Sequence, residues 1–181
     1  VNIASNLTFE DDGPSLGSSS GSEPSLLVDE TNLAANDSAS FAALLGGGLP
    51  INYGADGAGS AVYALNVSAA GVDSGLNDVA TGQSILLYKV SDTLIEGRVG
   101  GIGGAVSFSV TVDANGLVTL NQVLAIEHLP NTTNDQPISM AIDTLISLTL
   151  TVTDRDNDAV SASVNIASNL TFEDDGPSLG S

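Results

Sequence analysis

The residues best suited to chemistry are five consecutive positions, Asp154-Arg155-Asp156-Asn157-Asp158. Three aspartates alternate along a turn between two segments with strand-like patterning. Oxygen ligands at alternate positions can surround one hard cation, as they do in calcium-binding loops. The segment is not an EF-hand, because Ala159 and Asn165 stand where that loop has glycine and glutamate. We therefore predict a calcium site with further ligands from elsewhere; the alternative is an aspartate-rich turn without a metal.

A second acidic cluster occurs twice, because residues 1–18 recur letter for letter as residues 164–181, an offset of 164 − 1 = 163. Each copy has three adjacent acids before Gly-Pro: Glu10-Asp11-Asp12-Gly13-Pro14 and Glu173-Asp174-Asp175-Gly176-Pro177. An identity of this length predicts one period of a tandem array, with both junctions included. The acids are interpreted as ion ligands at these junctions; the alternative is a solvated acidic hinge.

The repeat also predicts the domain boundaries. Residues 1–18 are the end strand and linker of a preceding repeat, residues 19–172 are one β-sandwich repeat, and residues 173–181 lead to the next repeat. The expected partners are neighbouring repeats of the same chain, and a single repeat is expected to be monomeric. The detached segment Val1–Phe9 is either frayed or paired with an open sheet edge of another molecule.

Topology connects the two acidic clusters. A chain that passes through a seven-strand sandwich enters at one end and leaves at the other, and the turn before its last strand lies at the end where it entered. We therefore predict that calcium bridges the incoming and turn acids, Glu10, Asp11 and Asp12 with Asp154, Asp156 and Asp158. The outgoing acids, Glu173, Asp174 and Asp175, serve the next repeat. One extra strand in the path would reverse this pairing.

Three weaker candidates lie elsewhere in the chain. Asp29-Glu30 closes the first predicted strand, where it either caps a helix or binds a second ion. Asp56 lies in the glycine-flanked turn Tyr53–Gly57 and is interpreted as structural. Asp113 belongs to a predicted hairpin turn, Asp113-Ala114-Asn115-Gly116.

Charge and composition narrow the function classes. The 181 residues include 22 acidic and three basic side chains, for a net charge of −19. This excludes nucleic acid as a partner, which needs cationic contacts to phosphates, and argues against anionic membrane surfaces. The acids cluster in short runs, which favours a divalent cation over solubility alone. There is no cysteine, which excludes disulfides and thiolate zinc sites, and no apolar run long enough for a membrane helix.

Hydrophobic alternation predicts an all-β, Ig-like antiparallel β-sandwich. In residues 146–153, for example, apolar and hydroxyl side chains alternate, as a sheet with one buried and one wet face requires. About eight strands are expected, in the range of an Ig-like domain. They are residues 25–29, 61–69, 84–90, 93–99, 105–112, 117–124, 146–153 and 160–166. Residues 31–45 carry a weak helix signal.

Four of these segments together resemble a known family. Leu27–Thr31, Tyr53–Gly57, Thr153–Asp158 and Phe172–Pro177 are similar to the tandem extender repeats of giant RTX adhesins exported by type I secretion. The resemblance implies an Ig-like sandwich that binds calcium, partly at domain junctions, on the bacterial cell surface. Such repeats hold a ligand-binding tip away from the cell in adhesion and biofilm formation. The glycine-rich RTX nonapeptide is absent, since Ala105 follows Gly100–Gly104 where aspartate is needed, so this chain is not the β-roll.

The resulting expectation is a calcium-stiffened structural spacer, not an enzyme. The single histidine, His128, is next to Glu127, but no phosphate loop, nucleophile elbow or zinc signature accompanies it. The alternative is a calcium-dependent sugar- or protein-binding module on the same fold. Sugar sites use exposed aromatic rings, and the candidates here are the dispersed Tyr53, Tyr63 and Tyr88.

Overall fold

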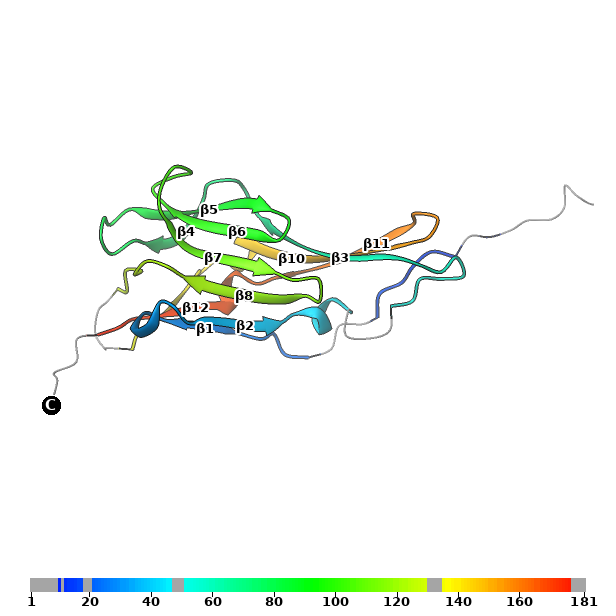
Figure 1. Ribbon diagram of the computed structural model, residues 1–181, viewed down its shortest axis with the longest axis horizontal. Coiled ribbons are helices and arrows are strands. Elements are labelled where there is room, and N and C mark those ends of the chain that lie inside the picture. The colour runs from blue at the N-terminus through cyan, green and yellow to red at the C-terminus, as the bar shows by residue number, and fades with distance from the viewer. Residues whose placement is uncertain (1–9, 11, 18–20, 47–50, 130–134, 177–181) are drawn as a thin grey trace, which may run out of the picture.

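The computed structural model describes residues 10, 12–17, 21–46, 51–129 and 135–176, which form an all-β sandwich (Figure 1). The strands of this part of the chain are β1 (Leu26–Asp29), β2 (Asn36–Ser40), β3 (Ala58–Val67), β4 (Val72–Asn77), β5 (Ser84–Ser91), β6 (Leu94–Val99), β7 (Val106–Val112), β8 (Leu117–Gln122), β9 (Pro137–Ser139), β10 (Ile146–Asp154), β11 (Ala159–Asn165) and β12 (Leu170–Glu173). Short 3₁₀ turns are η2 (Glu30–Asn32), η3 (Ala42–Leu45), η4 (Asp143–Leu145) and η5 (Ala167–Asn169).

Three sheets make up the sandwich. The largest has six antiparallel strands in the order β2-β8-β7-β6-β5-β4. The others have the orders β11-β10-β3 and β1-β12-β9, and β12 follows β11 directly through η5. Within the described residues, no helix is long and apolar enough to cross a membrane.

The predicted alternation is confirmed, because every one of the eight expected strands is present with small shifts at its ends. In β10, Ile146, Leu148, Leu150 and Val152 are fully buried, and the serine and two threonines between them are partly exposed. The core joins the sheets through Phe108 on β7 and Phe172 on β12, whose ring centroids are 5.0 Å apart. The short strand β12 is therefore part of the core.

The helix predicted for residues 31–45 is wrong. The segment forms η2, then β2, then η3, and β2 pairs with β8 along five residues. Side chains of β2 alternate between exposed and half-buried, and Asp37 Oδ2 accepts a hydrogen bond from Leu27 N at 2.8 Å. Pairing with a neighbouring strand outweighed the weak helix propensity of this polar segment.

The sheets also contain strands that the prediction missed. These are β4 with six residues, β9 with three and β12 with four. β12 pairs with β1 in parallel, with Leu26 opposite Leu170 and Asp29 opposite Glu173. The sandwich is therefore antiparallel except at this pair.

The two ends of the domain have different roles. The chain enters at the right-hand end of Figure 1, beside the turn between β10 and β11, and leaves at the opposite end after β12. We call these the incoming end (residues 52–57 and 154–158) and the outgoing end (residues 29–35, 78–83, 100–105, 122–129 and 173–176). The additional strands did not reverse this arrangement.

The Phe108–Phe172 contact predicts the effect of a core substitution. Phe172→Ala should lower the free energy of unfolding by about 3–5 kcal/mol, because it leaves a cavity between the sheets. Urea denaturation followed by circular dichroism measures the change. Val62→Ala on β3, where the side chain is 54% exposed, is the control and should cost less than about 0.5 kcal/mol. Equal losses in both variants would show that β12 is not part of the core.

Candidate metal site at the incoming end

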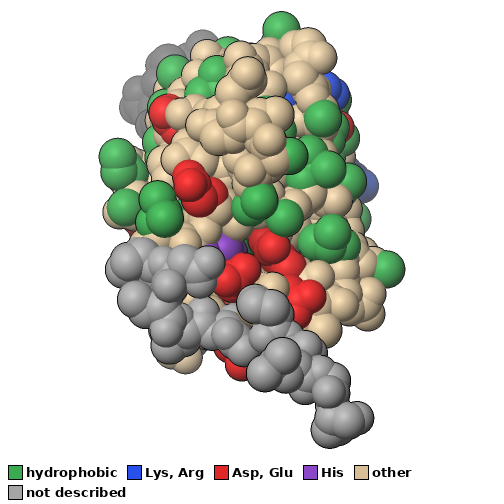
Figure 2. All heavy atoms as spheres, turned by 90° about the vertical axis from the view of Figure 1, so that its left-hand side faces the viewer, with side chains coloured by type: hydrophobic (Ala, Val, Ile, Leu, Met, Phe, Trp, Pro, Cys, Tyr) green, Lys and Arg blue, Asp and Glu red, His purple; other side chains and the backbone are tan. Residues whose placement is uncertain are grey.

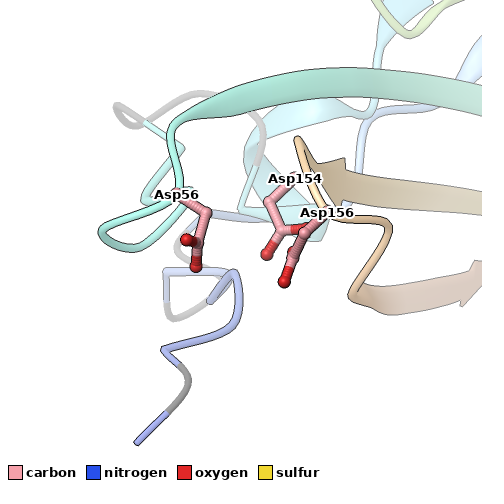
Figure 3. A group of neighbouring side chains, drawn as sticks. All are labelled: Asp56, Asp154 and Asp156. Carbon is pink, nitrogen blue, oxygen red and sulfur yellow. The ribbon is translucent and has the colours of Figure 1, made fainter. Parts of the chain in front are cut away.

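Three carboxylates converge at the incoming end. Asp154 ends β10, Asp156 lies in the following turn, and Asp56 comes from the turn before β3. Each offers a carboxylate oxygen within 4.8 Å of the others. Figure 3 shows the three carboxylate groups pointing toward the same side of the loops. The cluster therefore joins two turns that are far apart in the sequence.

The pairing of β3 with β10 brings these turns together. The ladder continues to Asp154, with an irregularity in register between Thr153 and Asp154. Gly59 makes the close approach possible, because a Cβ there would collide with the carbonyl oxygens of Thr153 and Asp154. A glycine at this position thus sets the distance between the Asp56 turn and the end of β10.

Asp154 is the central residue of the cluster and is only 3% exposed. Its Oδ1 accepts a hydrogen bond from Asp158 N at 2.8 Å, and its own N donates to Asp158 O at 3.0 Å. Asn157 closes the turn in the left-handed region with a φ of 82°, which asparagine tolerates well. The turn is thus built around the Asp154 carboxylate.

The second oxygen of Asp154 is buried and has no hydrogen-bond partner among the described residues. A buried carboxylate oxygen without a donor costs free energy, because it has lost its water and gained nothing in return. A cation between Asp154, Asp56 and Asp156 would supply the missing partner and reduce the repulsion between the three charges. The donor set, which consists of oxygens, fits a hard divalent cation.

The incoming segment lies against this cluster. A Cβ on Gly54 would collide with the carbonyl of Asp12, and a Cβ on Gly13 would lie 3.6 Å from Asp158 Oδ2. Ser15 N also donates to Asn52 O at 2.8 Å. Residues 12–15 are therefore in contact with both turns of the site. This agrees with the predicted location of the Asp154–Asp158 turn at the incoming end.

The predicted ligand set and the structure differ in several residues. Asp154 and Asp156 belong to the converging group, and Asp158 contributes main-chain bonds to the same turn. Glu10 and Asp12 are exposed and are not in the three-carboxylate group, and Asp11 lies outside the described residues. Asp56, interpreted from sequence as structural, is the added member. Its glycine-flanked turn was visible in the sequence, but its proximity to Asp154 was not.

At the outgoing end, Glu30 is satisfied by the protein itself. Its Oε1 accepts hydrogen bonds from Ile126 N at 2.7 Å and Gln122 Nε2 at 2.8 Å. His128 Nε2 lies 3.6 Å from the same oxygen, and the histidine side chain is 1% exposed. Figure 2 views this end and shows acidic side chains gathered around the histidine. Glu30 thus holds the loop after β8 against the start of η2.

The remaining outgoing acids surround the parallel strand pair. Asp29 and Glu173 are register partners on β1 and β12, and Asp174 N donates to Gln136 O at 3.3 Å. Asp175 follows and is exposed. Asp29 also caps η2, which is one of its two predicted roles. Hydrogen bonds from the hydroxyl and the N–H of Thr31 hold the pKa of the Asp29 carboxyl below its usual value. These acids lie at the opposite end from Asp154.

Asp113 has the predicted hairpin role. Its carboxylate accepts hydrogen bonds from Asn115 N at 2.8 Å and Leu117 N at 2.9 Å in the turn between β7 and β8. These bonds lower the pKa of the Asp113 carboxyl, and the bond from Leu117 N has the largest effect.

Comparison with known proteins identifies one relationship. A family model described as a domain of unknown function (DUF5801) matches residues 25–167. No curated protein and no solved structure matches the chain.

The contacts of Glu30 predict a large effect of its removal. Glu30→Ala should lower the free energy of unfolding by about 2–3 kcal/mol, because the buried Ile126 N–H and Gln122 amide lose a charged acceptor. Denaturant unfolding at pH 7 measures the loss. Asp92→Ala removes an acid whose side chain is 76% exposed and paired with Lys89, and should cost at most about 1 kcal/mol. If Glu30→Ala is no more costly than Asp92→Ala, Glu30 does not anchor the outgoing end.

Proposed function

Because this chain belongs to a family of domains of unknown function, we propose a role for it from its own residues. The chain is a calcium-stiffened spacer that forms one repeat of a tandem array. The observation that carries the proposal is the buried Oδ2 of Asp154, which has no hydrogen-bond partner in the part of the chain that the structure describes. The carboxylate of Asp154 lies close to two further carboxylates at the end where the chain enters from the preceding repeat. A cation bound there acts on a junction between repeats.

The donor chemistry favours calcium among the common cations. Asp56, Asp154 and Asp156 would hold the ion, and all three offer carboxylate oxygens. Calcium accepts six to eight oxygen ligands in irregular geometry, which suits ligands from two turns. Zinc prefers nitrogen and sulfur ligands, and the chain has no cysteine.

Contact between the site and the incoming segment supports a mechanical role. Asp158 belongs to the same turn as Asp154 and Asp156, and Gly13 lies beside its carboxylate. Order in this turn therefore restricts the incoming segment. Without an ion, the clustered charges repel one another and the turn loosens. The bound ion thus changes the stiffness of the joint, with no need for a catalytic step.

The wider setting of the proposal comes from the resemblance to RTX adhesin extenders. The array projects a ligand-binding tip from a bacterial cell surface, in adhesion or biofilm formation, after type I secretion. Calcium sites of extracellular modules bind at roughly 10⁻⁴–10⁻³ M, which fits the outside of the cell better than the cytoplasm. Calcium would therefore stabilise the fold only after export.

The environments of the tyrosines favour the spacer over a sugar-binding module. Tyr63 is 8% exposed, its ring packs against Gly116, and burial raises the pKa of its hydroxyl. Tyr53 and Tyr88 are half-buried. A sugar site needs aromatic faces open to the ligand, and the most central candidate is instead part of the core.

A charge-removing substitution tests the ion site. In chelator, Asp56→Asn should unfold at the same or a higher temperature than the parent chain, because one of three mutually repelling charges is gone. In millimolar calcium, the variant should lose most of the parent's calcium-induced rise in unfolding temperature. Differential scanning calorimetry measures both.

The matched control is Asp73→Asn, which makes the same charge change on β4. Its side-chain oxygen accepts a bond from Gly75 N at 2.9 Å that asparagine can retain. The control should show the full calcium response. A full calcium response in Asp56→Asn as well would remove Asp56 from the site.

Small-angle scattering of a chain with two repeats tests the spacer itself. Millimolar calcium should give a longer, stiffer particle than chelator does, because the ion restricts the segment between the domains. Coinciding profiles in the two conditions, with each domain folded, would mean that the junction is a solvated hinge. Isothermal calorimetry on the single chain, measured in parallel, reports whether calcium binds at all.

A further inference from the structure

Parts of the repeated segment are described at both ends of the domain, namely residues 10 and 12–17 at the first and 164–176 at the second, so the structure contains two sides of one junction. Subtracting 163 from a C-terminal position gives its N-terminal equivalent: Glu173 corresponds to Glu10, Asp175 to Asp12 and Gly176 to Gly13. In the C-terminal copy, Glu173 is the last residue of β12. In the N-terminal copy, the residues equivalent to Asp175 and Gly176 already contact the incoming end.

The distance between successive repeats follows from this equivalence. One residue, Asp174, separates the end of β12 from the position that contacts the next repeat. Two peptide steps span at most about 7 Å. Asp174 is itself bonded to the first domain through Gln136 O. The junction therefore has no length for a flexible linker, and the next repeat must begin directly at the outgoing end.

The outgoing end carries an unusual share of exposed apolar side chains. Of the ten large hydrophobic residues that are exposed in the described part of the chain, five lie in its loops: Leu33, Val79, Ile102, Val123 and Leu129, at 36–72% exposure. Figure 2 shows apolar side chains around the acidic group on this face. Val79 N donates a hydrogen bond to Ala125 O, and Ile126 N donates one to Glu30 Oε1. The loop that carries Val123 and Leu129 therefore lies beside the end of β1, which pairs with β12 where the chain leaves the domain.

Charge alone does not select the occupant of this face, because both ends of the domain carry several carboxylates. The outgoing end presents Asp29 and Glu173 side by side on neighbouring strands, and like charges at such positions repel. The incoming end carries Arg155, which is exposed and is one of three basic residues in the chain. End-to-end packing brings this positive charge to the junction together with the carboxylates of Asp56, Asp154 and Asp156, whose repulsion a bound cation would reduce.

We infer that consecutive repeats pack directly against each other, and that the apolar side chains of the outgoing end, Val123 and Leu129 in particular, are the docking surface for the incoming end of the next copy. This inference rests on the tandem array of the proposed function. It adds that the joint is a domain–domain interface as well as an ion site. Several exposed apolar groups at one end of a strongly acidic chain fit such a contact surface.

A distance measurement across the junction tests the interface. The chain is residues 1–163 followed by residues 1–181, which contains two repeats. Because the sequence has no cysteine, Ala80→Cys in the first repeat and Ala114→Cys in the second give two unique, exposed spin-label sites. Double electron–electron resonance in saturating calcium then reports the distribution of distances between them.

The test compares two pairs of substitutions in the first repeat. Val123→Ser with Leu129→Ser removes the docking side chains, and Val62→Ser with Val90→Ser removes two equally exposed apolar residues from strands away from the outgoing end. The parent and the control should give one narrow distribution. The docking variant should broaden it about twofold or more, because the domains lose their contact. Circular dichroism checks that all variants are folded.

Two results would overturn the inference. One is a broad distribution in the parent chain with calcium present, and the other is a docking variant as narrow as the control. Calcium binding to the single chain, measured by calorimetry, separates this failure from failure of the proposed function. Calcium binding together with a broad distance distribution would rule out the interface. A narrow distance distribution without calcium binding would rule out the ion site.

Discussion

The structure depends on the long ladder between β3 and β10. One part of this ladder lies against the six-stranded sheet, where Leu65 N donates to Asp92 O and alternate residues of β10 are fully buried. The ladder continues to the incoming end, where it brings the turn of Asp56 beside the turn of Asp154. Core packing and the acidic site are therefore built on the same pair of strands, and a shift in their register would disrupt both.

The two ends of the domain treat buried acids in opposite ways. At the outgoing end, Glu30 receives hydrogen bonds from the main chain of Ile126 and from Gln122. At the incoming end, one oxygen of Asp154 has no such donor within the described residues. A carboxylate that the protein satisfies itself is a structural element, whereas one left unsatisfied implies a ligand from outside. Composition alone could not make this distinction, because both ends are rich in aspartate and glutamate.

The strands with clear alternation could be predicted from sequence, because their apolar faces are long enough to show a period of two. β2 was missed because its residues, Asn36–Ser40, include no large apolar side chain, and β9 because it has three residues. In the site, the spacing of Asp154 and Asp156 within one turn is a local signal. Asp56 joins them only through the register of β3 on β10, which no local pattern contains. The location of the turn near residues 12–15 agrees with the expectation, although the path has more strands than the seven on which that expectation rested.

The parallel pairing of β1 with β12 has a mechanical consequence. β1 is the first strand after the incoming segment, β12 is the last before the chain leaves, and both run toward the outgoing end. Tension between the two ends of the domain pulls β1 back along its own axis while it pulls β12 forward. Their hydrogen bonds are then strained in shear and share the force, so they must break together rather than one after another. A strand pair of four residues thus gives the domain resistance to stretching along the same direction in which the chain passes through it.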